Sequence, residues 1–382
     1  MSFRKNVFIL GAGFSEDAGM PLMNDFLTRA RELRDDPRSK LNNSDREVFT
    51  KVVEYRFALD RALAKVSVDL DNIEQLFGFM EMDLQLGTDA EPGLRKAMTY
   101  LIARTLEASA VQNLPHGGRL FTKPNAQGSN WQFSFLQNQY RFFVGFVGGL
   151  WNAEKRDGQD SRDTLISFNY DLVLEREMVE LQIAPNYHCG PAALRYGGAF
   201  GSGKSRLNLL KMHGSANWVI CTECRKNLYF LTPEEAKVER VARLACPICN
   251  RLTLDAFILP PTWNKGIEQG FLRSVWAKAL AEVTNAGRLF IIGYSFPETD
   301  HFFKYMLGLA LARNNQLSKV YVVNPDSRVA EKFSGLFNQY FHERIVEHCA
   351  YPTTTFLDQR LSQFTRQEFT ESELDLALFS RG

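Results

Sequence analysis

The pattern that most constrains the fold is a series of short apolar segments that end in small or polar residues. One segment opens the chain at residues 7–10, and four more follow at 164–168, 207–213, 288–292 and 319–323. Such runs are typical of buried strands in a parallel sheet flanked by helices. Because parallel strands share one carboxyl edge, we expect the polar ends to converge there, where ligands bind in such sheets.

The first strand leads directly into a glycine-rich turn. Residues 6–21, NVFILGAGFSEDAGMP, predict a strand, a glycine turn and the start of a helix, as in a dinucleotide-binding unit. Glycines let the backbone approach a pyrophosphate, and a helix N-terminus offers N–H groups to it. A plain tight turn is the alternative. The candidate residues are Gly11, Ala12, Gly13, Phe14, Ser15 and Pro21.

The chain has 382 residues, enough for one elaborated core rather than several domains. We predict a Rossmann-like α/β core from residues 1–21 and 161–365, with helical spacing of apolar residues marking 22–160 as a large helical insertion. Residues 366–382 form a separate acidic and apolar C-terminal tail. Together, residues 1–382 are expected to make one domain.

Polar side chains follow two of the predicted strands. Asn169 and Asp171 come after the strand at 164–168, and His213 ends the strand at 207–213. A carboxamide can hold a ribose hydroxyl or a water, and a carboxylate can stabilise developing positive charge; a helix cap explains both equally well. His213 can act as a general base near neutral pH, although a lone histidine more often stabilises a turn.

Two further strands end in similar residues. Gly293 and Ser295 follow one strand, with Asp300 shortly after, and Asn324 follows another. Such positions can receive phosphate and ribose groups, or form ordinary turns. Residues 198–205, GAFGSGKS, match the P-loop expression, but they lack the preceding apolar strand and the following helix, so we interpret them as a flexible loop.

Two C-x-x-C pairs form the most specific local signal. Cys221 and Cys224 are separated by 21 residues from Cys246 and Cys249. Two such turns supply four thiolates to a tetrahedral zinc ion, and a complete set of four predicts a structural site. We therefore expect a small zinc ribbon at residues 218–256, in which the metal stabilises a flap of the chain and takes no part in catalysis.

Charge and hydropathy exclude several classes of partner. The chain carries 45 basic and 44 acidic side chains, a net charge of +1, so nucleic acid is not indicated as a partner. No apolar run approaches the roughly 20 residues that span a bilayer. The N-terminal apolar run is too short for a signal peptide. We expect a cytoplasmic protein with no membrane partner.

Taken in order, these motifs resemble the sirtuin-like family. That family combines a G-A-G-x-S…G-x-P loop, a strand ending in Asn-x-Asp, a His-Gly pair, a four-cysteine module, a Gly-x-Ser strand end and a late Asn. The resemblance implies NAD as substrate, with Gly11 to Ser15 at the pyrophosphate and Pro21 shaping that loop. It places Asn169 and Asp171 at the nicotinamide ribose and makes His213 the general base. Gly293, Ser295 and Asn324 would line the adenosine half.

The sequence departs from the protein deacetylases of this family. Those enzymes continue the Gly-x-Pro element into Asp-Phe-Arg, whereas Pro21 here is followed by Leu-Met-Asn-Asp-Phe without an arginine. The helical insertion and the Asn-Tyr-Asp form resemble bacterial sirtuin-like antiphage defence effectors, which hydrolyse NAD to nicotinamide and ADP-ribose. The zinc module is shared more with the deacetylases. We give more weight to the missing arginine and the insertion.

The leading hypothesis is therefore an NAD glycohydrolase. The alternatives are an NAD-dependent protein deacylase and a sensor that binds NAD or ADP-ribose without turnover. An active NAD hydrolase would drain its host, so a gate is expected. A homo-oligomer, or a separately encoded ATPase or other defence partner, would supply it.

Overall fold

A computed structural model describes most of the chain. The described residues are 5–62, 68–87, 93–113, 139–150, 161–196, 205–259, 269–297, 300–335, 346–350, 352–353 and 356–357. The tail at 366–382 and the glycine-rich loop at 198–204 lie outside them. Predictions made for those two segments therefore stay predictions.

A seven-stranded parallel sheet forms the centre of the protein. Its strands are β1 (Asn6–Leu10), β2 (Thr164–Ser167), β3 (Ile183–Asn186), β5 (Ser205–Lys211), β9 (Arg288–Ile292), β10 (Lys319–Val323) and β11 (Val346–Cys349). Their order is β11-β10-β9-β1-β2-β5-β3, and every neighbouring pair is parallel. After β1 the chain forms β2 on one side of β1, and it later forms β9 on the other side of β1. The strand order thus reverses at β1, where ligands bind in open α/β sheets.

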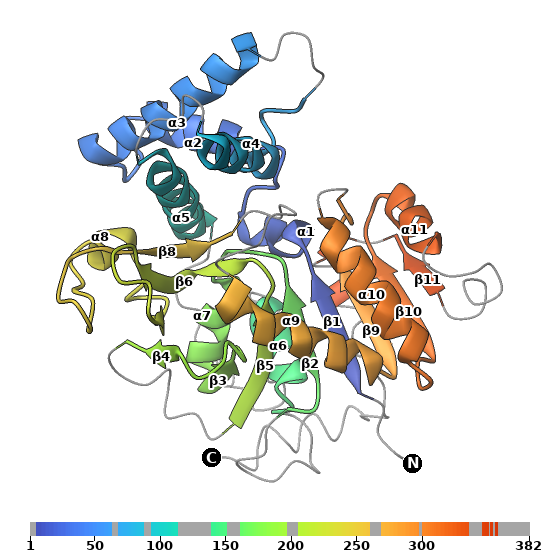
Figure 1. Cartoon of the computed structure of the whole chain (residues 1–382). Coiled ribbons are helices and arrows are strands. Elements are labelled where there is room, and N and C mark those ends of the chain that lie inside the picture. Colours follow the sequence, from blue (N-terminus) through green and yellow to red (C-terminus); the bar gives the residue numbers. More distant parts are fainter. Residues whose placement is uncertain are drawn as a thin grey trace, which may run out of the picture.

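Helices cover the sheet and form a lobe beside it (Figure 1). They are α1 (Ala12–Ser15), α2 (Phe26–Asp35), α3 (Asn43–Ala62), α4 (Ile73–Leu86), α5 (Leu94–Asn113), α6 (Gln139–Val147), α7 (Val173–Glu180), α8 (Val238–Val241), α9 (Gln269–Thr284), α10 (His301–Arg313) and α11 (Ser327–Ser334), with a 3₁₀ turn at Glu16–Ala18. Helices α2 to α5 make up the lobe at the top of Figure 1.

An aromatic row explains how one face of the sheet is packed. Phe8, Phe290 and Tyr321 occupy matching register positions on β1, β9 and β10. Their rings stack at centroid distances of 4.8 Å for both neighbouring pairs. Phe143 of α6 meets Phe8 edge-on at 5.4 Å. Helix α6, which lies within the segment 22–160, therefore covers the sheet instead of joining the lobe.

A second sheet carries the cysteines. It contains β4 (Ala193–Arg195), β7 (Leu228–Phe230), β6 (Gly214–Cys221) and β8 (Leu254–Ile258), in the order β4-β7-β6-β8. Strand β6 begins immediately after His213, so the candidate base stands at the junction of the two sheets. The predicted fold class is confirmed: a Rossmann-like parallel sheet with a large helical insertion and a small four-cysteine module.

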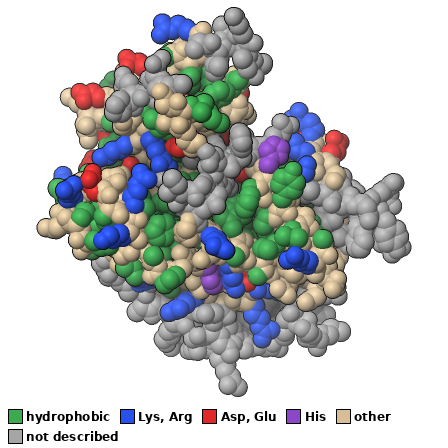
Figure 2. All heavy atoms as spheres, in the orientation of Figure 1, with side chains coloured by type: hydrophobic (Ala, Val, Ile, Leu, Met, Phe, Trp, Pro, Cys, Tyr) green, Lys and Arg blue, Asp and Glu red, His purple; other side chains and the backbone are tan. Residues whose placement is uncertain are grey.

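The surface agrees with the balanced charge. On the face shown in Figure 2, Lys and Arg side chains lie scattered among acidic and apolar ones, and apolar side chains gather over α9 and α10. Phe302, Tyr305 and Leu309 of α10 are among the exposed large apolar residues. In the described part of the chain, no helix is both long and apolar enough to cross a membrane.

Candidate functional site

The glycine loop after β1 packs directly against the turn after β9. The N–H of Gly13 donates to the carbonyl of Gly293 at 2.9 Å, and the N–H of Gly11 donates to Ile292 at 3.1 Å. A Cβ on Gly11 would lie 2.5 Å from the Cα of Tyr294, and one on Gly293 would lie 2.2 Å from the nitrogen of Phe14. Gly293 also has a φ of +60°. Only glycine allows these two turns to interlock.

This packing gives the glycines a structural role. The N–H groups of Gly11 and Gly13 are bound within the protein, and the predicted approach of a pyrophosphate to this loop stays a prediction. The expected helix start is also short, because α1 ends at Ser15 and a 3₁₀ turn follows. The glycines therefore allow backbone-to-backbone contact between β1 and β9 turns.

Three distant side chains fix the carbonyl groups of this loop. Asn169 Nδ2 donates to the carbonyl of Gly11 at 2.8 Å and to Ser15 Oγ at 3.1 Å. The Tyr140 hydroxyl donates to the carbonyl of Phe14 at 2.8 Å, and Thr353 Oγ1 donates to that of Gly13 at 2.9 Å. Asn169 thus joins the end of β2 to the glycine loop, as its position after the strand predicted. Nothing in the sequence indicated the parts played by Tyr140 and Thr353.

His213 is the first member of a buried hydrogen-bonded chain. Its Nε2 lies 3.1 Å from Asp300 Oδ1, and the hydroxyl of Tyr294 donates to Asp300 Oδ2 at 2.6 Å. The three residues are 1%, 5% and 3% exposed, respectively. Burial and the nearby Asp300 charge raise the pKa of Tyr294 well above its usual value, so the phenol stays protonated and donates.

Aromatic rings surround the imidazole. The His213 ring lies 5.3 Å from Phe168, 6.4 Å from Tyr170 and 6.3 Å from Trp276, measured between centroids. The next residue, Gly214, has a φ of +83°, and a Cβ there would sit 2.0 Å from the carbonyl oxygen of Phe257. His213 is therefore held in an enclosed position at a turn that requires glycine.

A second buried charge lies two residues before His213. Lys211 Nζ donates to the backbone carbonyl of Asp171 at 2.7 Å and pairs with Glu175 Oε1 at 3.3 Å. Lys211 is 1% exposed and Glu175 is fully buried. Burial raises the pKa of Glu175, and the Lys211 ammonium opposes that rise. The pair anchors the loop that carries Asn169 and Asp171.

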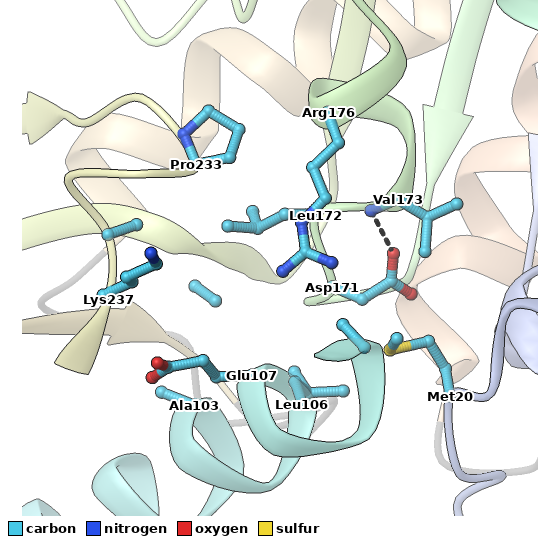
Figure 3. Close-up of a pocket in the computed structure, with 13 residues that line it drawn as sticks. Met20, Ala103, Leu106, Glu107, Asp171, Leu172, Val173, Arg176, Pro233 and Lys237 are labelled. Atoms are coloured by element: carbon cyan, nitrogen blue, oxygen red, sulfur yellow. Dashed lines mark hydrogen bonds between the residues drawn. The ribbon is translucent and has the colours of Figure 1, made fainter. Parts of the chain in front are cut away.

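The Asp171 side chain caps helix α7 and lines a pocket. One of its carboxylate oxygens accepts the N–H of Val173 at 3.0 Å, which is a helix-capping interaction. Its side chain lines a pocket between helix α5, the start of α7, strand β6 and the segment from Pro233 to Lys237 (Figure 3). Neither Asn169 nor His213 is among the residues that line this pocket.

The remaining predicted ligand-binding residues lie along the β9 and β10 ends. Ser295 is exposed, and its carbonyl accepts a hydrogen bond from Lys332 at 3.3 Å. Asn324 Oδ1 accepts the N–H of Asp326 at 2.9 Å, as in ordinary turn chemistry. Ala12 and Pro21 are partly exposed near the same edge. The structure thus brings the glycine loop, Asn169 and Gly293 together, and leaves Ser295 and Asn324 further along the edge.

The four predicted zinc ligands converge. The Sγ atoms of Cys221, Cys224, Cys246 and Cys249 all lie within 4.8 Å of one another. The Cys221–Cys249 and Cys224–Cys246 Sγ distances are both 3.6 Å. A tetrahedral zinc with Zn–S bonds of about 2.3 Å requires sulfur separations of about 3.8 Å. The cluster could therefore hold a zinc ion with little movement.

Hydrogen bonds prepare one of these thiols for metal binding. Burial alone would raise the pKa of Cys221, but hydrogen bonds from the N–H of Cys224 and from the Thr253 hydroxyl outweigh it and lower the pKa to about 6. Metals bind the thiolate form. The cysteine module lies beyond β6, away from the His213 ring, which fits a structural metal.

Comparisons with known proteins find similarity only at the level of structure. No protein-family model matches the chain, and no curated protein matches it. A structure of a Sir2 enzyme aligns over 95% of this chain and 92% of its own, with 12% identity and a TM-score of 0.40. A Sir2 homologue in complex with ADP-ribose aligns over 96% of both chains, with 14% identity and a TM-score of 0.39.

A further solved structure is a Sir2 mutant with a p53 peptide and NAD. It covers 95% of this chain and 94% of its own, at 12% identity and a TM-score of 0.37. Values this low do not define the family of the chain.

Proposed function

We propose that this protein is an NAD glycohydrolase of the sirtuin-like type. The observation that carries the proposal is the bonding of Asn169 to Gly11 and Ser15 at the point where the strand order reverses. That point is where open α/β sheets bind dinucleotides. The order of motifs along the sequence supports NAD as the dinucleotide.

The proposed chemistry needs a base and a fixed polar group. His213 accepts a proton from water, the water oxygen adds to the ribose carbon, and the bond from that carbon to nicotinamide breaks with its electron pair on the leaving ring. Asn169 holds the ribose and helps stabilise the oxocarbenium-like state. With its proton on Nε2 facing Asp300, the His213 ring presents its other nitrogen as acceptor, the form that a general base requires.

Burial of the base supports a gate. His213 is 1% exposed and sits among Phe168, Tyr170 and Trp276. NAD would reach it only after a rearrangement of these surroundings, so the described conformation corresponds to a closed enzyme. We propose, as finer parts of the same hypothesis, a cytoplasmic antiphage defence effector gated by a homo-oligomer or by an ATPase or other defence partner. The four cysteines would hold structural zinc.

The test is nicotinamide release from NAD by the purified protein, without any peptide. We expect release by the wild type in the oligomeric or partner-bound state that opens the site, and a loss of about 10²–10⁴-fold in His213→Ala under the same conditions. Asn169→Ala should lose activity too, with circular dichroism verifying the fold of both variants. Release that depends on an acylated peptide would instead indicate a deacylase. Tight NAD binding with no product under any condition would indicate a sensor.

A further inference from the structure

The segment that runs from β5 into β6 is joined to the loop after β2 by backbone hydrogen bonds. The N–H of Met212 donates to the carbonyl of Ser167 at 2.9 Å, and the N–H of Ala216 donates to the carbonyl of Tyr170 at 2.9 Å. These bonds place the candidate base beside the loop that carries Asn169. Because they join backbone atoms, substitution of a side chain leaves them in place.

A side chain supplies the third bond between the same two segments. Lys211 is the last residue of β5, and its Nζ donates to the carbonyl of Asp171 at 2.7 Å. The same Nζ lies 3.3 Å from Glu175 Oε1 of helix α7. Since Lys211 is 1% exposed, water is not at hand to replace the bond if the ammonium is removed. The ammonium therefore ties the end of β5 to the far end of the loop and to the first turn of α7.

The ion pair between Lys211 and Glu175 adds little net stability. Both charges are removed from water, and their attraction in the interior often only balances the cost of that desolvation. Burial raises the pKa of Glu175, which is the sign of this cost, and the ammonium opposes the rise. The consequence of the pair therefore lies in the geometry that it fixes, namely the position of the loop carbonyl that Lys211 holds.

We propose that Lys211 is a positioning residue for the cleavage of NAD. Its bond to the Asp171 carbonyl fixes the end of the loop, and Asn169 thereby keeps the orientation in which Nδ2 reaches the carbonyl of Gly11. Lys211 acts through Asn169 and takes no part in bond cleavage. The inference rests on the proposed function, because it takes Asn169 as the group that holds the ribose. A misplacement of about 1 Å at such a group can lower a rate by about 10²-fold.

Two variants of the full-length protein separate positioning from stability. Lys211→Met keeps the length of the side chain without the donor, and it leaves the Glu175 carboxylate buried without its counter-charge. We expect a lower Tm and a loss of about tenfold in kcat/KM for nicotinamide release, under conditions in which the wild type is active. The double variant Lys211→Met/Glu175→Gln removes the buried charge as well. Its Tm should return toward the wild-type value, whereas its kcat/KM should stay about tenfold lower.

Lys278→Met is the matched control. Lys278 Nζ pairs with Glu282 Oε1 at 2.8 Å, so this variant also removes a lysine from a buried glutamate. That pair lies at the amino edge of the sheet, where Glu282 accepts the hydroxyl of Thr164 at the start of β2. We expect a lower Tm and unchanged nicotinamide release.

A measurement without NAD decides the proposal by itself. In protein labelled with ¹⁵N-asparagine, the NMR signal of the Asn169 carboxamide is identified by its loss in Asn169→Ala. The signal should shift in Lys211→Met and in the double variant, and it should stay in place in Lys278→Met. An unmoved signal in Lys211→Met, or wild-type release by the double variant, would overturn the proposal. A wild type that releases no nicotinamide rejects the glycohydrolase alone, because the Asn169 signal is read without turnover.

Discussion

The cysteine module and the carboxyl edge of the main sheet are both built from chain turns, but they are held together over very different sequence distances. Cys221 lies 28 residues from Cys249, and the thiols meet through two short turns. At the sheet edge, Asn169 reaches Gly11 across 158 residues, and Thr353 reaches Gly13 across 340. The stability of the cysteine module should therefore depend on one bound ion, as in a local unit. The geometry of the sheet edge depends instead on the folding of the whole core.

Removal of the metal should produce the largest effect on stability. Structural zinc contributes about 10–16 kcal/mol in isolated finger peptides, and part of that should appear here. We expect Cys246→Ser to lose bound zinc and to lower the Tm by roughly 10 °C. Proteolysis should become faster within residues 221–249, measured by mass spectrometry of the fragments.

A matched control separates the metal from the loss of any thiol. Cys189→Ala removes a buried cysteine outside the cluster and should keep one zinc per chain by elemental analysis. If the wild type contains no metal, or if Cys246→Ser unfolds with the wild-type Tm, the structural zinc is disproved.

Replacement of Asp300 should have the next largest effect, this time on catalysis. Asp300→Asn removes the carboxylate that faces His213 Nε2, so the imidazolium loses stabilisation and the preferred tautomer can change. We expect a loss of about 10²-fold in kcat for nicotinamide release with little change in KM. The acidic limb of the pH profile should move to lower pH, because the base becomes easier to deprotonate.

Tyr294→Phe is the control for this prediction. It removes only the hydroxyl that donates to the far oxygen of Asp300, so we expect a decrease of a few-fold and no shift of the pH profile. Equal effects of the two substitutions would mean that Asp300 acts through packing and not through its charge.

The smallest predicted effect is on the pH dependence of stability. It concerns the amino edge of the main sheet, opposite the candidate site. Asp163 accepts two hydrogen bonds from Asn6, at 2.8 and 3.0 Å. Burial raises its pKa from 3.8 to about 6, although the bonds from Asn6 oppose the rise. The folded state therefore binds the proton more tightly, and its stability falls as pH rises from about 4 to about 6.

Asp163→Asn should remove this part of the pH dependence. The difference in Tm between variant and wild type should move in favour of the variant as pH increases from 4 to 7, measured by differential scanning calorimetry. Nicotinamide release should stay unchanged, since this edge lies away from His213. A constant difference across that range would contradict the raised pKa.

The fold could be predicted because its signals are local. The strands at 288–292 and 319–323 were predicted with the bounds observed, and the cysteine spacing was sufficient to predict the cluster. Each pattern depends on neighbours within a few residues, where apolar periodicity and turn chemistry act directly.

The site was predicted less completely because its contacts are long-range. Asp300 was noted as part of a strand end, but its bond to His213 spans 87 residues and has no local signature. The Lys211–Glu175 pair was missed for the same reason. The glycines of the first loop were recognised, but their packing against Gly293 depends on a strand found more than 280 residues later.

The most direct test of the account is a crystal structure of His213→Ala soaked with NAD. The account predicts the dinucleotide across the carboxyl edge between β1 and β9, with the nicotinamide ribose beside Asn169. NAD bound away from this edge, or no NAD at concentrations at which the wild type turns it over, would contradict it.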